Sequence, residues 1–561
     1  MQFANSHQLF LKLLNQFLGR FTQPCTVGFL VYCHLLTAAS SAAAAPQNST
    51  PESKSLNSNN AVQVPDEILL HQFEVIGNEV IPPSEIDELL QPYLFRPIEF
   101  VELIELQQRI TKLFVKRGYF NSGAYIPPQT IKNNTLRVEI IQGRIEDIKI
   151  YGLEELHPDY VLKRLNRFLK PPVNEKSLLK ALQLLQLNPL IANITAEVSQ
   201  GLKPGQSYLQ ITVEEADNFY AELTIDNYRT PSIGAGSRQL EVSDQNLLGF
   251  GDRFNVKYIN TDGSNSLSNL GYKIPLGADN STLEARLSVN NSRIITDVFA
   301  DLNLTSRNRY FDLTYRQPLW ESPSNDFTLG LSASYQTTQL SLMDIGFPTL
   351  ARGSDEEGIT TVSALRFAQE YRDRGTDHAF VVSSQFNIGL DILDATSNPD
   401  PLPDGSFFLW RGQLQYLKRF APRNNFLIRS KIQLADRPLV SLEQFAAGGP
   451  LNVRGYTQDG ISADNGVFFS IEFNNAVWQN SAENVKFEVI PFFDVAKVWN
   501  NDDFPVEAND LISVGLGLQF TIQDILVSRI DWGVPFLETP DFPENSLQES
   551  GFYFSLKFRP L

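Results

Sequence analysis

The feature that most constrains this fold is a two-residue alternation of apolar and polar side chains that runs from Asp217 to the end of the chain. Between Ile512 and Ile522, every even position is apolar, and the odd positions carry serine, glycine, glutamine or threonine. A strand with this pattern presents one apolar face and one polar face. Segments of about ten such residues separated by polar turns are typical of a transmembrane β-barrel, although a soluble β-sandwich also alternates.

The alternating region, residues 217–561, holds about sixteen such segments, and barrels of this kind usually have even strand numbers. We therefore predict an all-β antiparallel transmembrane barrel of about 16 strands. The last segment, 552–558, has large apolar residues on one face and Tyr553, Ser555 and Lys557 on the other. A phenylalanine-rich final strand is similar to the terminal signal of outer-membrane barrels, although this chain continues to Leu561.

The first 45 residues have the composition of a secretory signal peptide. They contain Lys12 and Arg20 but no acidic residue, and then an apolar stretch from Val27 to Ala39 and a run of Ser and Ala. The alternatives are an amphipathic helix or a membrane anchor, but the apolar stretch is shorter than the ~20 residues that a spanning helix needs. Residues 46–66 are rich in Ser, Asn and Pro, which predicts a disordered linker without a long plug helix.

The composition argues against nucleic-acid binding and against catalysis. The chain has 46 Lys and Arg residues against 64 Asp and Glu, a net charge of −18, so nucleic acid is a poor partner. Five His are scattered without metal-ligand spacing, and the sequence has no Gly-x-Ser-x-Gly or phosphate-loop motif. We therefore expect no enzyme activity, no cofactor and no metal. Because Cys25 and Cys33 lie in the predicted signal peptide, the mature chain is expected to fold without disulfides.

Between the linker and the alternating region, helical and strand patterns occur twice in the same order. In residues 67–143, a strand that ends at Gly77 is followed by two helical segments and two strands. Residues 144–216 repeat this order, and Gly152 lies 75 positions after Gly77. The repeat predicts two α+β units, with one irregular α/β domain as the alternative.

Two helices are expected in the first of these units. The longer one spans Glu99 to Lys116, where apolar residues recur at helical spacing. The shorter one is expected to begin at Ser84, because Asp87 follows three residues later in the arrangement of a weak capping box.

Residues 440–463 interrupt the strand pattern and contain Val453-Arg454-Gly455-Tyr456. A glycine directly after the arginine permits a tight turn, which would project the guanidinium to one side. An arginine inside a barrel needs a carboxylate, because an unpaired charge away from water is costly. In the strand expected at 485–498, Asp494 has the parity of the lumen side, so we predict it as the partner of Arg454. The alternative is an exposed loop, with Asp494 as one of many lumen acids.

With these motifs the chain resembles the outer-membrane transporters of two-partner secretion, the TpsB class that exports haemolysins and filamentous adhesins. The resemblance covers Ile68 to the C-terminus. It implies two periplasmic POTRA domains, at 67–143 and 144–216, followed by a 16-stranded barrel at 217–561.

The resemblance also implies roles for particular residues. The family's Val-Arg-Gly-Tyr loop folds back into the lumen and contacts an aromatic-x-Asp-x-Gly strand motif. In this chain the loop motif is Val453, Arg454, Gly455 and Tyr456, and its partners are Phe492 and Asp494. Ala496 stands where the strand motif usually has glycine. The family's early strand-turn motif is matched by Asn246, Gly249, Gly251 and Asp252.

The function that the resemblance implies is protein secretion. The POTRA domains are expected to bind an unfolded, TpsA-like β-helical partner in the periplasm, and the barrel is expected to translocate it to the cell surface or medium. We expect a monomeric pore in contact with the lipid of a bacterial outer membrane. Two alternatives stay open: an assembly or import factor of the same superfamily, and a solute porin with a periplasmic accessory domain. A structural adhesin would need surface repeats that the sequence does not contain.

Overall fold

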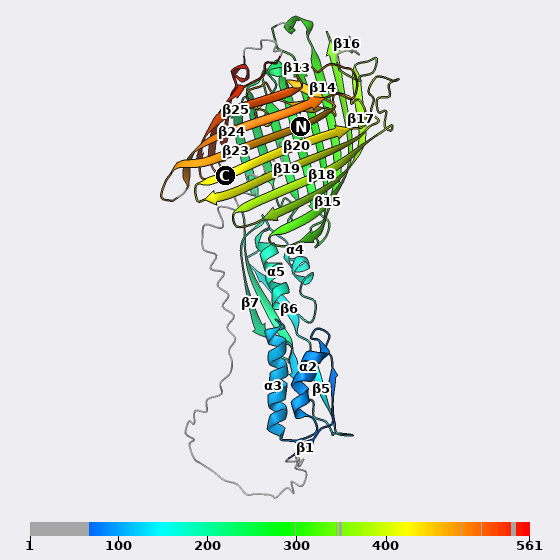
Figure 1. The fold of residues 1–561 in the computed structure, drawn as a ribbon, viewed down its shortest axis with the longest axis vertical. Helices are drawn as coiled ribbons and strands as arrows, with labels where there is room; N and C mark the ends of the chain where they lie inside the picture. Colours follow the sequence, from blue (N-terminus) through cyan, green and yellow to red (C-terminus); the bar gives the residue numbers. More distant parts are fainter. Residues whose placement is uncertain are drawn as a thin grey trace.

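The computed structural model describes residues 67–297, 299–343, 345–346, 351–482, 484–506, 508–539 and 546–560. The predicted signal peptide, the predicted linker and the expectation about a plug helix lie outside these residues. Figure 1 shows two small α/β units, in blue and cyan, one after the other beneath one end of a large β-barrel. The N-terminal unit lies farther from the barrel.

The first unit packs two helices, α2 (Pro83–Leu90) and α3 (Phe100–Lys116), against a small sheet. The sheet has the order β2-β5-β4, formed by β2 (Gln72–Ile76), β5 (Thr135–Ile141) and β4 (Gly123–Tyr125). A further short pair consists of β1 (Ile68–Leu69) and β3 (Pro97–Ile98). The apolar side chains that recur at helical spacing in α3, such as Leu106 and Ile110, are fully buried in the core of this unit.

The start of α3 follows the expected pattern, whereas the start of α2 does not. Glu99 is the N-cap of α3, and its backbone N–H donates to the Glu102 side chain over 3.0 Å in a capping box. The capping box expected from Ser84 and Asp87 is wrong, because α2 begins at Pro83 and has no side-chain cap hydrogen bond. Proline suits this first position because its backbone is already close to helical and needs no N–H partner.

The second unit repeats the topology of the first. Its sheet has the order β6-β8-β7, and it comprises β6 (Arg144–Tyr151), α4 (Pro158–Asn166), α5 (Glu175–Gln186), β7 (Ile191–Gln200) and β8 (Gln206–Glu215). In both three-stranded sheets, the strand that comes first in the chain pairs in parallel with the one that comes last. Gly77 and Gly152 follow these first strands with φ of +83° and +82°, where a β-carbon would lie 2.7 and 2.2 Å from a carbonyl oxygen. Both positions therefore require glycine.

Sixteen of the strands after residue 216 close into an antiparallel barrel, which confirms the predicted fold class. The closed sheet contains one further strand, β16 (Ile345–Gly346), which pairs only with the end of β15. The sixteen wall strands are β9 (Phe219–Asp226), β10 (Ser237–Asp244), β11 (Arg253–Asn260), β12 (Ser264–Pro275), β13 (Thr282–Arg293), β14 (Thr305–Glu321), β15 (Asn325–Leu342), β17 (Ile359–Arg374), β18 (His378–Leu390), β19 (Phe408–Ala421), β20 (Asn424–Ala435), β23 (Asn465–Gln479), β24 (Val485–Trp499), β25 (Asp510–Ile522), β26 (Leu526–Pro535) and β27 (Phe552–Phe558).

The alternation in the sequence separates the two faces of this wall. On β14, Phe311 and Leu313 are 46% and 40% exposed, whereas Asp312 and Thr314 between and beside them are buried. The exposed apolar side chains form the outer surface, and the polar ones face the lumen. Among the described residues, no helix is long and apolar enough to cross a membrane.

Chain direction determines which end of the barrel adjoins the α/β units. Only three residues separate β8 from β9, so β9 starts at the barrel end that lies beside the second unit. The turns at this end include the three-residue connections 322–324 and 375–377. The longest connections, such as 391–407 and 436–464, lie at the opposite end. Short turns at one end and long loops at the other are the usual asymmetry of outer-membrane barrels.

Gly152→Ala should destabilise the second unit by ~2 kcal/mol, because the added methyl group meets the Val213 carbonyl and the residue must keep a positive φ. Hydrogen exchange of the full chain should then become faster in β6 and β8. Gly236→Ala is the control, since its β-carbon would meet no atom within 4 Å. Unchanged protection of β6 and β8 in Gly152→Ala would contradict the role given to this glycine.

Candidate functional site: the loop inside the barrel

The connection between β20 and β23, residues 436–464, turns back into the barrel, and we call it the lumen loop. Its stem is a pair of short antiparallel strands, β21 (Phe445–Ala447) and β22 (Ile461–Ala463). Gly448 and Gly449 leave β21 with φ of +99° and +95°, a backbone shape that favours glycine. The stem thus carries the Val453–Tyr456 segment toward the barrel wall.

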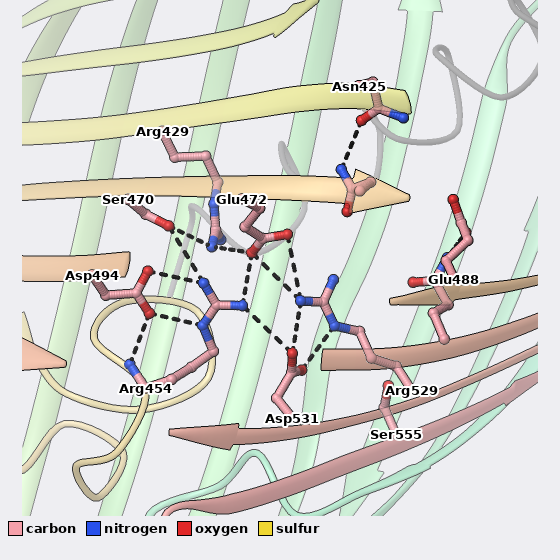
Figure 2. A network of polar contacts seen from close by, with 12 residues as sticks. Asn425, Arg429, Arg454, Ser470, Glu472, Glu488, Asp494, Arg529, Asp531 and Ser555 are labelled. Atoms are coloured by element: carbon pink, nitrogen blue, oxygen red, sulfur yellow. Dashed lines mark hydrogen bonds and ion pairs between the residues drawn. The ribbon is translucent and has the colours of Figure 1, made fainter. Parts of the chain in front are cut away.

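Arg454 is the largest fully buried side chain among the described residues, with 1% of its surface exposed. Its Nε and Nη2 donate to the two carboxylate oxygens of Asp494 on β24, over 2.7 and 2.9 Å. The backbone N–H of Arg454 also donates to Asp494, over 3.1 Å. Figure 2 shows this fork of contacts. The structure therefore brings together the arginine and the aspartate that strand parity pairs.

The arginine has more carboxylate partners than sequence reasoning expected. Its Nη1 lies 2.8 Å from Glu472 on β23 and 3.5 Å from Asp531 on β26. Arg429 on β20 contacts Glu472 over 2.9 Å, and Arg529 on β26 contacts Asp531 over 2.8 Å. Three arginines thus face three carboxylates in one network (Figure 2).

The alternation of apolar and polar residues identifies the missed members of this network as lumen-facing, but it does not show that they contact Arg454. Glu472 and Asp531 occupy lumen-side positions on their strands, as Asp494 does. Many other lumen positions also carry charge, and nothing local in the sequence says which of them meet across the barrel. The Arg454 network forms because the loop and four strands converge at one height in the lumen.

Phe492 and Ala496 form the floor beneath the loop. The guanidinium carbon of Arg454 lies 3.4 Å from the centroid of the Phe492 ring, which adds a cation–π contact to the ion pairs. Ala496, where the family motif usually has glycine, is 2% exposed and belongs to the same apolar cluster as Val453 and Tyr456. The loop therefore packs on the alanine methyl group.

Gly455 and Tyr456 tie the loop to the last strands of the barrel. The N–H of Gly455 donates to the hydroxyl of Tyr553 on β27 over 2.8 Å, and this hydroxyl donates to the carbonyl of Tyr456 over 2.6 Å. The Tyr456 hydroxyl in turn donates to the carbonyl of Ile512 on β25 over 3.0 Å. Gly455 has φ +100°, and a β-carbon there would lie 3.3 Å from the Gly533 carbonyl. No larger residue fits this approach without movement.

A second anchor of the lumen loop, Glu443, was not found from the sequence. It is 2% exposed and lies 2.6 Å from Arg366 on β17 and 3.0 Å from Arg411 on β19. The loop is therefore held at two places by charges of opposite sign: Glu443 binds wall arginines, and Arg454 binds wall carboxylates. The signal that could have suggested Glu443 is an acid inside an interval that already carries a conspicuous arginine.

The early motif lies elsewhere, in the turn between β10 and β11. The Asn246 side chain accepts from the N–H of Gly251 over 2.8 Å, and Asp252 accepts from the N–H of Leu248 over 3.0 Å. Asp252 also accepts from the hydroxyl of Tyr272 on β12 over 2.8 Å. These bonds hold a compact turn at the end of the barrel beside the second α/β unit.

This turn is the docking surface for the second unit. The carbonyl of Gly249 accepts from the N–H of His157 over 2.8 Å, and Gly251 packs so closely on the Tyr160 ring that a β-carbon would lie 2.2 Å from it. Arg167 also pairs with Glu321 at the end of β14 over 3.0 Å. Burial at this contact lowers the pKa of Arg164, which donates to Asn280 over 2.9 Å. The early motif thus links the two parts of the molecule and is not part of the Arg454 network.

Among the residues that the structure describes, no three or more His, Cys, Asp or Glu are grouped as metal ligands. The contacts that hold the lumen loop to the barrel wall include the ion pairs of Arg454 and Glu443.

Comparisons with known proteins place the chain in a class. A model of the haemolysin secretion/activation proteins ShlB/FhaC/HecB matches residues 205–520, and a model of the ShlB-type POTRA domain matches residues 68–143. A POTRA region followed by a 16-stranded barrel, with these matches, defines an outer-membrane protein transporter. Its barrel lies in the outer membrane, and its POTRA region lies in the periplasm.

Individual relatives agree with this class. The chain is 22% identical over 448 residues to the outer membrane transporter CdiB of Dickeya dadantii, covering 76% of this chain and 75% of that protein. It is 21% identical over 484 residues to the heme/hemopexin transporter protein HuxB of Haemophilus influenzae, covering 81% of each. The solved structure of CdiB from Escherichia coli has the same fold, with a TM-score of 0.66, 18% identity, and 92% of this chain and 94% of that chain covered.

Because the first family model covers more than half of the chain, the protein belongs to the haemolysin secretion/activation family. It is a TpsB transporter of two-partner secretion, which exports a partner protein through its POTRA region and barrel.

Asp494→Asn should weaken the Arg454 end of the loop by ~2–3 kcal/mol, because a buried guanidinium loses its bidentate partner but keeps Glu472. The expected result is a lower temperature for the heat-induced shift of the barrel on a semi-native gel. Glu488→Gln is the matched control, since Glu488 lies on β24 and its bond to Gln519 over 3.0 Å is outside the Arg454 network. Equal behaviour of the two variants would contradict a special role for Asp494.

Proposed function

We propose that the lumen loop is a latch, and that the transporter admits its unfolded partner when the Arg454 end of the loop is released. The charge balance of the Arg454 network supports this. If Arg454 leaves, Glu472 keeps Arg429 at 2.9 Å and Asp531 keeps Arg529 at 2.8 Å. Only Asp494 then loses its arginine, and a single carboxylate exposed to an opened lumen can be solvated. Release of this end is therefore costly but reversible.

The Glu443 end, in this proposal, stays in place. If Glu443 left, two nearly buried arginines, Arg366 and Arg411, would lose the same carboxylate together. Removing one partner from a buried ion cluster is strongly unfavourable, and here two cations of like sign would remain side by side. Glu443 is therefore the fixed end of the lumen loop, and Arg454 is the moving end.

We also propose that the POTRA sheets bind the partner by adding a strand of it to an edge. In the second unit, β7 pairs with β8 on one side, and no described strand pairs with its other side. β7 has ten residues, and the last four of them are exposed. Such an edge offers unpaired backbone N–H and C=O groups. An extended segment of an unfolded, strand-forming partner can form hydrogen bonds with them.

The partner in this proposal is an unfolded β-helical protein, and the transporter is a passive, monomeric pore without catalytic activity. The sequence has no phosphate-loop motif, so the drive that we propose is folding of the partner after it emerges. Deleting the gene and comparing the surface and medium proteomes tests this. Loss of one large exported protein supports it, whereas a general loss of barrels would support an assembly factor, and altered solute uptake alone would support a porin.

Arg454→Ala should abolish or strongly reduce export of the partner, because the loop loses its contacts to Glu472, Asp494 and Asp531. The barrel itself should still assemble and shift with heat on a gel. Arg437→Ala is the matched control, because Arg437 lies in the same loop but is exposed, and its one ion pair among the described residues is with its neighbour Asp436 at 3.3 Å. Normal export by Arg454→Ala would refute the latch.

Glu443→Gln should lower the stability of the barrel by ~3–5 kcal/mol, more than Asp494→Asn, because two buried arginines lose their charge partner. Denaturant-induced loss of the compact gel form measures this difference. A smaller effect for Glu443→Gln than for Asp494→Asn would show that the fixed and moving ends have been assigned the wrong way round.

A further inference from the structure

A group of cations lines the lumen at the periplasmic end of strands β11 to β17. Arg253 begins β11, Lys273 lies near the end of β12, and Arg316 lies near the end of β14, so chain direction places all three at this end. Parity places them inside: Arg253 shares its face with buried Asn255, whereas exposed Tyr258 lies on the opposite face. We call the following set the entrance collar: Arg253, Lys273, Arg286, Arg316, Arg372 and Arg374.

Two members of the entrance collar face each other with the same charge. Arg253 and Lys273 are directly opposite in the register of β11 and β12, an arrangement that costs stability. Neither has an ion-pair partner among the described residues. Glu284 attracts the Lys273 ammonium, but Arg253, Arg316 and Arg372 all repel it. An unfavourable cluster of this kind persists in a fold when something else uses it.

The carboxylates of the same wall do not cancel the collar. Asp312 forms an ion pair with Arg286 at 2.7 Å, and Asp326 forms one with Arg374 at 2.6 Å. Glu370 is shared by Arg372 and by Arg316, the latter at 3.9 Å. With Glu284, four carboxylates face the six cations of the collar, a difference of +2, in a chain whose net charge is −18.

One long connection at the opposite end of the barrel is acidic. The connection 391–407 contains four aspartates and no lysine or arginine. The excess of cations in the collar favours anions at the periplasmic entrance of the barrel.

We propose that the entrance collar is a binding surface for acidic segments of the unfolded partner as they pass from the POTRA region into the barrel. This inference rests on the proposed function and adds the chemistry of the segment that is bound first. The excess cations at Arg253 and Lys273 are the ones that an acidic side chain would neutralise, since the other collar members already contact carboxylates.

The test uses single cysteines in the full chain, which is practical because its only cysteines are Cys25 and Cys33, and these are changed to serine. Thr282→Cys on β13 reports on the collar, because Thr282 is directly opposite Arg316. Ser292→Cys lies on the same face of β13, ten residues away, about 33 Å along the strand and beyond the ~8 Å Debye length.

Each cysteine is labelled with an anionic sulfonatoethyl and a cationic trimethylammonioethyl methanethiosulfonate. The anionic-to-cationic rate ratio at position 282 should exceed that at position 292 by roughly tenfold at low salt. Arg253→Gln with Lys273→Gln should lower the ratio at 282 about fivefold and leave 292 unchanged, because the double substitution removes two cations near position 282 and none near position 292. Two results would refute the proposed role of the entrance collar. One is an equal rate ratio at the two positions, and the other is a rate ratio at position 282 that the double substitution does not change.

The second arm identifies the ligand. A short poly-glutamate peptide should slow labelling at position 282, whereas poly-lysine should not, and inorganic phosphate at equal charge should protect far less. No protection by poly-glutamate, or equal protection by phosphate, would overturn the assignment to a polypeptide. Because labelling needs no exported partner, this result is independent of whether Arg454→Ala blocks export.

Discussion

The structure of the lumen depends on one constraint: an arginine carried inside a barrel must be neutralised there. Arg454 meets this constraint with a bidentate bond to Asp494, a second carboxylate at 2.8 Å and an aromatic ring at 3.4 Å. These partners come from β23 and β24, so the arginine fixes the height and orientation of the whole loop. The loop also contacts two further strands. Gly455 donates to the Tyr553 hydroxyl on β27 and lies close to Gly533 on β26.

The two anchors of the lumen loop differ in the charges that each would leave unpaired if it were released. In the Arg454 network, Arg429 and Arg529 would still form ion pairs with two of the three carboxylates if Arg454 left. At the other anchor, a single carboxylate, that of Glu443, pairs with two arginines. These unequal penalties support the proposal that Glu443 is the fixed end of the lumen loop and Arg454 the moving end. The early turn motif also joins the barrel to the α/β region, because Gly249 and Gly251 contact the second α/β unit directly.

Much of the fold could be predicted because its signals are local. Alternation identifies the wall strands, helical spacing identifies α3, and the 75-residue offset of Gly77 and Gly152 identifies the repeat. The start of α2 could not be predicted from Ser84, since proline at the first helical position made a side-chain cap unnecessary. For the site, parity and family resemblance led to Asp494 and Phe492, but Glu443, Glu472 and Asp531 looked like any other lumen acids.

What the sequence by itself determined is therefore the set of faces: which residues point to lipid, which point to the lumen, and where the repeat and the loop begin. Faces follow from the period of the backbone, which is fixed within each strand. What only the tertiary structure decided is which lumen charges meet. That choice depends on how 16 strands close and on the depth to which the loop enters, and both join residues that lie far apart in the chain, such as Arg454 and Asp531.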